Sequence, residues 1–229
     1  MMIFPYSFIE KVKLLLKNDA DAFLKTLQGE APVSVRINPD KFPENHAWRN
    51  NERVAWCKSA VYLQHRPIFT LDPLIHASAY YVQEASSMFL EQVFNHLLFE
   101  QEELRVLDLC AAPGGKSTHL LSLLNNKSLL VSNEVIRSRV GVLTENLMKW
   151  GKPNFIVSNN DSEDFKKLNY QFDVVVVDAP CSGEGLFRKD KNAVNEWSEE
   201  NVSLCIARQS RILEDIERII KPDGYLIYS

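Results

Sequence analysis

The stretch that decides the fold is LDLCAAPGGK, residues 107–116. It begins inside an apolar segment, residues 105–110, that is typical of a strand, and it continues with two alanines, a proline and two adjacent glycines. A helix is expected to follow, through Leu124. Small residues at such a turn let a ligand approach the backbone, and the N-terminus of the helix offers free N–H groups. The pattern therefore predicts a ligand-binding turn between a strand and a helix.

Strands and helices alternate from this turn onward. Further strands are expected at residues 128–134, 154–158, 172–178 and 224–228, and helices at residues 138–150 and 199–221. The segment FDVVVVD, residues 172–178, is apolar without alternation, as expected of a strand covered on both faces. The alternation predicts an α/β fold with a doubly wound, mostly parallel sheet, that is, a Rossmann-like core.

A small α+β domain is expected before this core. Residues 7–27 carry apolar side chains at helical spacing, and residues 33–37 and 60–63 read as short strands. Residues 78–99 are expected to be helical. The predicted organisation is therefore an N-terminal domain at residues 1–75 and the core at residues 76–229.

Composition excludes several classes of protein. The 229 residues are 45% hydrophobic and 24% charged, as in a folded globular protein and unlike a disordered chain, and a net charge of −4 argues against a wholly basic nucleic-acid coat. No apolar run reaches the roughly 18 residues that a membrane span needs. The 4 cysteines lack disulfide-framework or metal-ligand spacing, and Cys57 and Cys205 are expected to be structural. A cytoplasmic monomer that binds neither membrane nor metal is expected.

The glycine turn also has a competing interpretation as a P-loop. Gly115, Lys116 and Ser117 open a helix after a strand, as in a nucleotide-binding P-loop. That pattern requires a glycine five residues before Gly115, and Cys110 stands there. A P-loop nucleotidase is therefore the weaker alternative.

Acidic residues follow the next two expected strands. Glu134 comes about 20 residues after the glycine turn, where an acid can accept hydrogen bonds from a ribose diol. Asp161 follows the third strand, where an acid could meet an adenine amino group. Both acids are therefore candidates for binding a nucleoside.

A cysteine follows the strand at residues 172–178. The stretch DAPCSGEG, residues 178–185, places a proline, a thiol and two glycines directly after that strand. A lone cysteine is more often a small buried apolar residue than a nucleophile. This loop is expected to be rigid and to point Cys181 into a ligand-binding cleft at the carboxyl ends of the strands. A functional role is therefore favoured for Cys181.

Taken in order, these pieces resemble the Sun/Nop-type RNA cytosine-5 methyltransferases. The matching pieces are YVQEASSM at residues 81–88, LDLCAAPGGK, Asn133-Glu134 and DAPCSGEG. The resemblance covers residues 34–229 and is strongest to the bacterial enzymes that act on small-subunit ribosomal RNA, because SVRIN, residues 34–38, and YVQEASSM precede the core.

The resemblance implies S-adenosyl-L-methionine as cofactor and RNA, in particular ribosomal RNA, as substrate. It implies cofactor contacts at Cys110, Ala111, Ala112, Pro113, Gly114, Gly115, Lys116, Glu134, Asp161 and Asp178. In such enzymes a cysteine thiolate adds to carbon 6 of cytosine, carbon 5 takes the methyl group, and loss of the carbon 5 proton expels the enzyme. The target base must leave its stack to be reached.

The family uses two cysteines, and only one has a counterpart here. Cys181 matches the Pro-Cys residue, which assists product release, and Asp178 lies beside it as the second implied catalytic residue. The nucleophile belongs to a Thr-Cys pair, and Tyr228-Ser229 resembles the residues just before that pair. We expect a truncated chain that binds cofactor without forming the adduct. The alternative, for a complete chain, is a non-catalytic S-adenosylmethionine-binding scaffold or RNA-binding protein.

RNA contacts are expected at basic residues of the N-terminal domain and of the segment that follows DAPCSGEG. The candidates are Arg36, Arg188, Lys189 and Lys191. Cationic side chains neutralise phosphates and supply the sequence-independent part of RNA affinity.

Overall fold

The computed structural model describes residues 3–98, 103–168, 170–190 and 192–229. Within those ranges no helix is both long and apolar enough to cross a membrane. The chain forms two compact units, each built from two segments: Met1–Ala31 with Pro180–Arg211, and Pro32–Ala179 with Ile212–Ser229. The predicted domains, residues 1–75 and 76–229, divide the chain by its sequence motifs, whereas these two units divide it by packing. The predicted domain division stays a prediction.

The larger unit contains a five-stranded sheet in the order β6-β5-β4-β7-β8, with every neighbouring pair parallel. Its strands are β4 (Arg105–Asp108), β5 (Leu129–Asn133), β6 (Phe155–Ser158), β7 (Phe172–Val177) and β8 (Ile220–Tyr228). The chain runs outward from β4 to β6, then returns to β7 on the other side of β4. This confirms the predicted doubly wound sheet. Ligands bind such sheets at the carboxyl ends of the strands beside this reversal.

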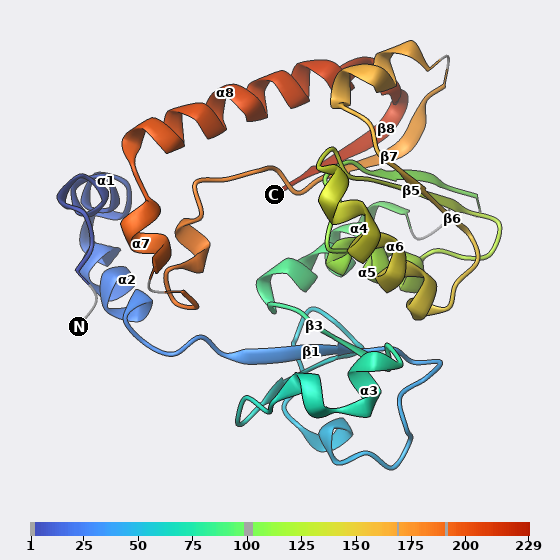
Figure 1. Cartoon of the computed structure of the whole chain (residues 1–229), viewed down its shortest axis with the longest axis horizontal. Helices are drawn as coiled ribbons and strands as arrows, with labels where there is room; N and C mark the ends of the chain where they lie inside the picture. Colours follow the sequence, from blue (N-terminus) through green and yellow to red (C-terminus); the bar gives the residue numbers. More distant parts are fainter. Residues whose placement is uncertain (1–2, 99–102, 169, 191) are drawn as a thin grey trace. The chain divides into compact units, whose positions relative to one another are not determined.

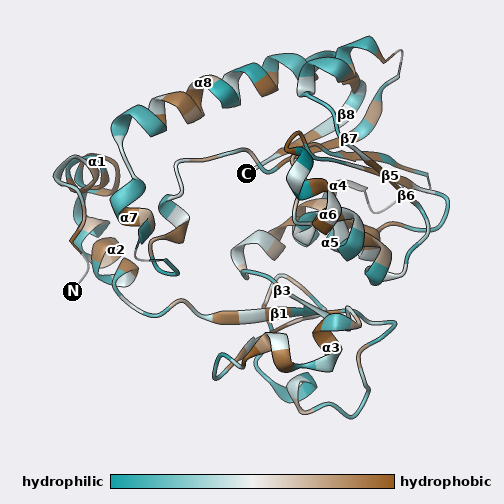
Figure 2. Cartoon of the chain, viewed as in Figure 1, coloured by the Kyte–Doolittle hydropathy of each residue, from teal (hydrophilic) through white to brown (hydrophobic). Residues whose placement is uncertain are grey.

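Helices α4 (Leu90–Leu98), α5 (Gly115–Leu123) and α6 (Arg137–Trp150) cover one face of this sheet (Figure 1). The other face packs against the end of α8 (Glu199–Ile216), where Ile212 and Ile216 meet alternate residues of β4 and β7. Hydrophobic colour accordingly runs along these inner strands, whereas α8 is mixed (Figure 2). Helix α8 ends before residue 221, where it was expected to end, because a 3₁₀ turn follows and β8 begins at Ile220.

A smaller antiparallel sheet in the order β2-β1-β3 belongs to the same unit. It consists of β1 (Val33–Ile37), β2 (Ala60–Leu63) and β3 (Tyr80–Val82), and a short helix α3 (Pro73–His76) precedes β3. The helix expected over residues 78–99 is therefore wrong in its first part. Tyr80 and Val82 pair with Ile37 and Val35, since aromatic and β-branched residues suit a sheet edge. A 3₁₀ turn, η4 (Ser86–Phe89), then leads into α4.

The smaller unit joins two parts of the chain that are far apart in sequence. Its elements are α1 (Tyr6–Leu16), η1 (Lys17–Asp19), α2 (Ala20–Leu27), η6 (Glu184–Leu186), α7 (Asn192–Glu196) and the first part of α8. Its core is aromatic: the ring of Phe8 lies 5.2 Å from that of Phe187 and 5.6 Å from that of Trp197, both edge-on. The indole of Trp197 also donates a hydrogen bond of 2.7 Å to Glu184.

Candidate cofactor and catalytic site

The predicted turn joins the end of β4 to the start of α5. Gly114 has a φ of 111°, a left-handed conformation that strains any other residue, and an added Cβ would lie 3.4 Å from Cδ1 of Leu143. No side chain caps the N-terminus of α5 in the structure as described. The first N–H groups of that helix can therefore bind an anionic group of a ligand.

Asp108 is a buried acid at this turn, and it was not among the predicted site residues. Its Oδ2 accepts a hydrogen bond of 2.6 Å from Ser117, whose hydroxyl accepts one of 2.9 Å from Ser132. Its Oδ1 has no hydrogen-bond partner among the described residues. Burial raises the pKa of Asp108 to about 7 against the opposing effects of Ser117 and Lys116. The acid in LDLC was the available sequence signal, but an acid near a strand end is common.

Glu134 faces the same turn from the end of β5. Its carboxylate is only 3% exposed and accepts hydrogen bonds from the backbone N–H groups of Ile136, at 2.9 Å, and Ala112, at 3.3 Å. Arg139 forms an ion pair with the carboxylate at 3.3 Å and also donates to the carbonyl of Ala112. The structure thus brings two predicted cofactor-binding elements, Glu134 and the turn, into direct contact.

Lys116 and Asp178 connect the turn to the end of β7. The Lys116 ammonium lies 2.7 Å from the Asp178 carboxylate, and the lysine side chain is 11% exposed whereas the aspartate is 51% exposed. Ser229 also donates to Asp178, at 3.4 Å. Asp178 therefore presents a partly open carboxylate next to the glycine turn.

Asp161 follows β6 by three residues and caps the start of the 3₁₀ helix η5 (Ser162–Lys167). Its carboxylate accepts from the N–H of Glu163 at 3.1 Å, and its own N–H donates to Asp164 at 3.2 Å, forming a capping box. Neighbouring Asn160 is tied to β5, because Asn133 donates to its carbonyl at 2.9 Å. The loop after β6 is thereby fixed to the end of β5.

The two cysteines of interest differ in their surroundings. Burial raises the pKa of the Cys110 thiol to about 12, and nearby carboxylates such as Asp108 act in the same direction. A thiol with so high a pKa is a poor nucleophile at neutral pH, which suits a residue that lines a site. Cys181 is exposed. It belongs to the smaller unit, whereas Asp178 belongs to the larger one, because the boundary lies between Ala179 and Pro180.

Known protein families match most of the length of this chain. Residues 95–229 match the 16S rRNA methyltransferase RsmB/F family, and residues 4–85 match the N-terminal domain of 16S rRNA methyltransferase RsmF. The chain belongs to the RsmB/F family. The predicted membership of the Sun/Nop-type RNA methyltransferases is thereby confirmed.

The relatives of this chain include proteins named ribosomal RNA small subunit methyltransferase F. The one from Vibrio vulnificus is 35% identical over 98% of this chain and 50% of its own length. The one from Serratia proteamaculans is 32% identical over 98% and 49%. The chain therefore spans about half the length of the curated relatives it matches.

Solved structures share the fold of this RsmB/F-family chain. A methyltransferase homologue from Pyrococcus horikoshii superposes with a TM-score of 0.81 and 26% identity over 99% of this chain and 73% of the homologue. NSun6 from the same organism, solved with SFG, gives a TM-score of 0.81 with 16% identity, over 99% and 83%.

The predicted RNA contact at Arg36 requires a correction, because that side chain is fully buried in this RsmB/F-family chain. Its guanidinium donates to Thr118 Oγ1 at 2.6 Å, to Gln83 at 2.9 Å and to the carbonyl of Gly115 at 3.2 Å. It also lies 4.4 Å from the ring centre of Trp150. Arg36 therefore connects the small sheet to α5, and no surface remains for a phosphate to contact.

The other predicted RNA contacts are in the smaller unit. Arg188 is half-buried and donates to the carbonyl of Glu30, and Lys189 is exposed. Lys191 lies outside the described residues. RNA contacts by Arg188, Lys189 and Lys191 stay predictions.

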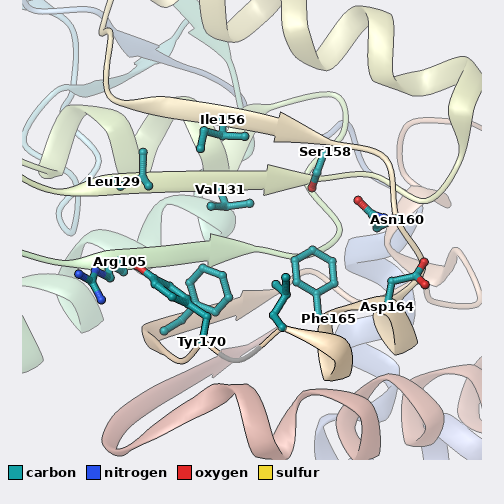
Figure 3. A pocket seen from close by; sticks show the side chains of 11 residues that line it. Arg105, Leu129, Val131, Ile156, Ser158, Asn160, Asp164, Phe165 and Tyr170 are labelled. Carbon is teal, nitrogen blue, oxygen red and sulfur yellow. The ribbon is translucent and has the colours of Figure 1, made fainter.

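An apolar pocket of about 530 Å³ opens on the sheet face opposite α4, α5 and α6 (Figure 3). Leu129, Val131 and Ile156 of the sheet face Phe165 and Tyr170 across it. The predicted cofactor residues do not line this pocket, so we do not assign the cofactor to it.

Proposed function

We propose that this chain is the cofactor-binding part of an enzyme that transfers a methyl group from S-adenosyl-L-methionine to carbon 5 of a cytosine in ribosomal RNA. The observation that carries the proposal is the contact between buried Glu134 and the N–H of Ala112. It brings a carboxylate suited to a ribose diol against a turn suited to close ligand approach. Family membership supplies the reaction class.

The residues present fit this cofactor. The turn from Cys110 to Lys116 would line its methionine and sugar, Glu134 would accept from the ribose hydroxyls, and Asp161 would lie near the adenine. Asp178 would lie near the methyl-transfer end. The bound cofactor supplies an electrophilic methyl group. The uncapped α5 N-terminus suits the cofactor carboxylate.

We infer that Cys181 assists product release, as its Pro-Cys context implies. The nucleophilic thiolate would come from a second cysteine, in a Thr-Cys pair, which no residue of this chain matches. An enzyme that methylates ribosomal RNA would be located in the cytoplasm and would bind RNA. The monomeric state stays a prediction.

A P-loop nucleotidase and a non-catalytic S-adenosylmethionine-binding protein are the competing functions. Isothermal titration calorimetry of the 229-residue chain with S-adenosylmethionine and with ATP distinguishes a P-loop nucleotidase from the proposed methyltransferase. Tight ATP binding without S-adenosylmethionine binding would contradict it. Methyl transfer to ribosomal RNA, measured for a form that includes the Thr-Cys pair, separates an enzyme from a binding protein, since the latter would give no transfer.

We expect Glu134→Gln to weaken S-adenosylmethionine binding about 10- to 100-fold. The amide keeps the size of the carboxylate but accepts weaker hydrogen bonds, and hydrogen bonds to a charged group contribute about 1.5–3 kcal/mol. Calorimetric titration gives the affinity directly. Glu145→Gln is the matched control, because Glu145 is an exposed residue of α6 that pairs with Lys149. Equal affinities for the Glu134 and Glu145 variants would remove Glu134 from the cofactor site.

A further inference from the structure

Three buried side chains with metal-binding atoms meet beside α5, the helix that follows the glycine turn. Cys57 precedes β2, Glu91 belongs to α4 and His119 belongs to α5. Their exposed fractions are 1%, 4% and 1%, and one ligand atom of each lies within 4.8 Å of the other two. The sequence predicted no metal site, because these residues are dispersed along the chain and only folding brings them together.

The distances among these atoms fit a tetrahedral zinc site. Nε2 of His119 lies 3.8 Å from Sγ of Cys57 and 3.1 Å from Oε2 of Glu91. Zinc binds sulfur at about 2.3 Å and nitrogen or carboxylate oxygen at about 2.0–2.2 Å, which puts neighbouring ligand atoms about 3.3–3.6 Å apart. The two observed distances lie on either side of this range, so small side-chain shifts are sufficient for coordination.

The mixture of ligands also points to zinc. A thiolate and an imidazole are poor ligands for magnesium or calcium, which prefer oxygen, and together they suit zinc. The Glu91 carboxylate adds a second negative charge once the thiol loses its proton. Two negative charges are needed here because the buried Arg36 guanidinium, which interacts electrostatically with both Glu91 and Cys57, adds a positive charge to that of the metal.

A cavity of about 440 Å³ borders the cluster and includes Glu91 and His119 in its wall. Its lining also contains three cationic side chains, Arg49, Arg53 and Lys58. Glu91 and His119 therefore border the cavity although both are buried, and a water molecule or small anion in the cavity would lie beside the cluster. An anion is favoured, because those cations attract it and because zinc bound to one new thiolate raises the local charge by one.

We propose that Cys57, Glu91 and His119 bind a zinc ion whose fourth ligand is a water molecule or chloride from this cavity. On binding, the Cys57 thiol loses its proton to solvent as the sulfur–zinc bond forms. The ion links the segment before β2 to α4 and α5. The proposal does not depend on the proposed methyltransferase function, and its test needs neither cofactor nor RNA.

The test uses the 229-residue chain, stripped with EDTA and then dialysed against zinc chloride. Native mass spectrometry should find one zinc per chain. Calorimetric titration should give an affinity at least about 100-fold lower for Cys57→Ser and for His119→Gln. Cobalt chloride in place of zinc should give a thiolate charge-transfer band that Cys57→Ser abolishes. Cys205→Ser, the same change in a half-buried cysteine of α8, should match the wild type in every measurement.

Two results would overturn the proposal. One is a wild-type chain that takes up no zinc. The cluster would then be a hydrogen-bonded triad in which Cys57 and His119 donate to the Glu91 carboxylate. The other is zinc bound equally by the wild type and both variants, which would place the ion elsewhere. Circular dichroism of each variant checks folding. If Cys57→Ser does not fold, His119→Gln decides the question, because glutamine can still donate to Glu91.

Discussion

We expect Arg36→Met to lower the free energy of unfolding by about 3–5 kcal/mol, because each buried polar group left unpaired costs about 1–3 kcal/mol. Methionine fills much of the same space but donates no hydrogen bond, so Gln83 and the Thr118 hydroxyl lose their buried donor, and the Gly115 carbonyl keeps only the bond from Thr118. It also removes the guanidinium from the face of Trp150. Urea unfolding followed by circular dichroism measures the change.

Two further variants define what Arg36 contributes. Arg66→Met removes an arginine that lies 5.4 Å from the ring centre of Phe69, and it should cost at most about 1 kcal/mol. Arg36→Lys should recover only part of the loss, since an ammonium lacks the planar fork that reaches four acceptors on Gln83, Gly115 and Thr118. Unfolding of Arg36→Met within about 1 kcal/mol of the wild type would show that Arg36 is not a structural link.

The second large effect concerns pH. We expect Asp108→Asn to match the wild type near pH 4 and to become more stable than it as the pH rises, by up to about 4 kcal/mol at pH 8. Burial raises the pKa of Asp108 to about 7, so the folded chain binds a proton that the unfolded chain releases near pH 4. Wild-type stability is therefore lost between about pH 4 and pH 7. Asparagine is uncharged at every pH, like the protonated acid, so the variant does not lose this stability.

The measurement is the difference between the two unfolding free energies across that pH range. The wild-type curve alone is insufficient, because burial also lowers the pKa of His119 to about 4 and gives a slope of opposite sign between pH 4 and 6.5. That slope is common to both proteins and cancels. Asp40→Asn, which alters an exposed carboxylate paired with Lys152, should stay within about 1 kcal/mol of the wild type throughout. A difference for Asp108→Asn that is constant with pH would refute the expectation.

The α/β order and the glycine turn could be predicted because their signals are local. Gly114 needs no distant partner to reveal a tight turn, and FDVVVVD is apolar whatever lies on either side of it. The strand at Tyr80–Val82 could not be recognised, because its partner β1 lies more than 40 residues earlier, and residues 78–99 as a whole suited a helix.

Long-range contacts explain the remaining differences. Arg36 resembles a surface cation in sequence, yet its acceptor on Thr118 lies 82 residues away and turns it into a core residue. Cys57, Glu91 and His119 each have an ordinary structural interpretation in isolation. Their chemistry arises only where the segment before β2 meets α4 and α5.

The aromatic core of the smaller unit has a consequence during synthesis on the ribosome. Helices α1 and α2 are made before the rest of the smaller unit, and Phe187 and Trp197, which pack on Phe8, are translated far later. At 5–20 residues per second that delay is on the order of 10–40 s. Throughout it Phe4 and Phe8 can pack on each other but lack the Phe187 and Trp197 rings, so α1 and α2 keep apolar surface exposed until the later segment has been made.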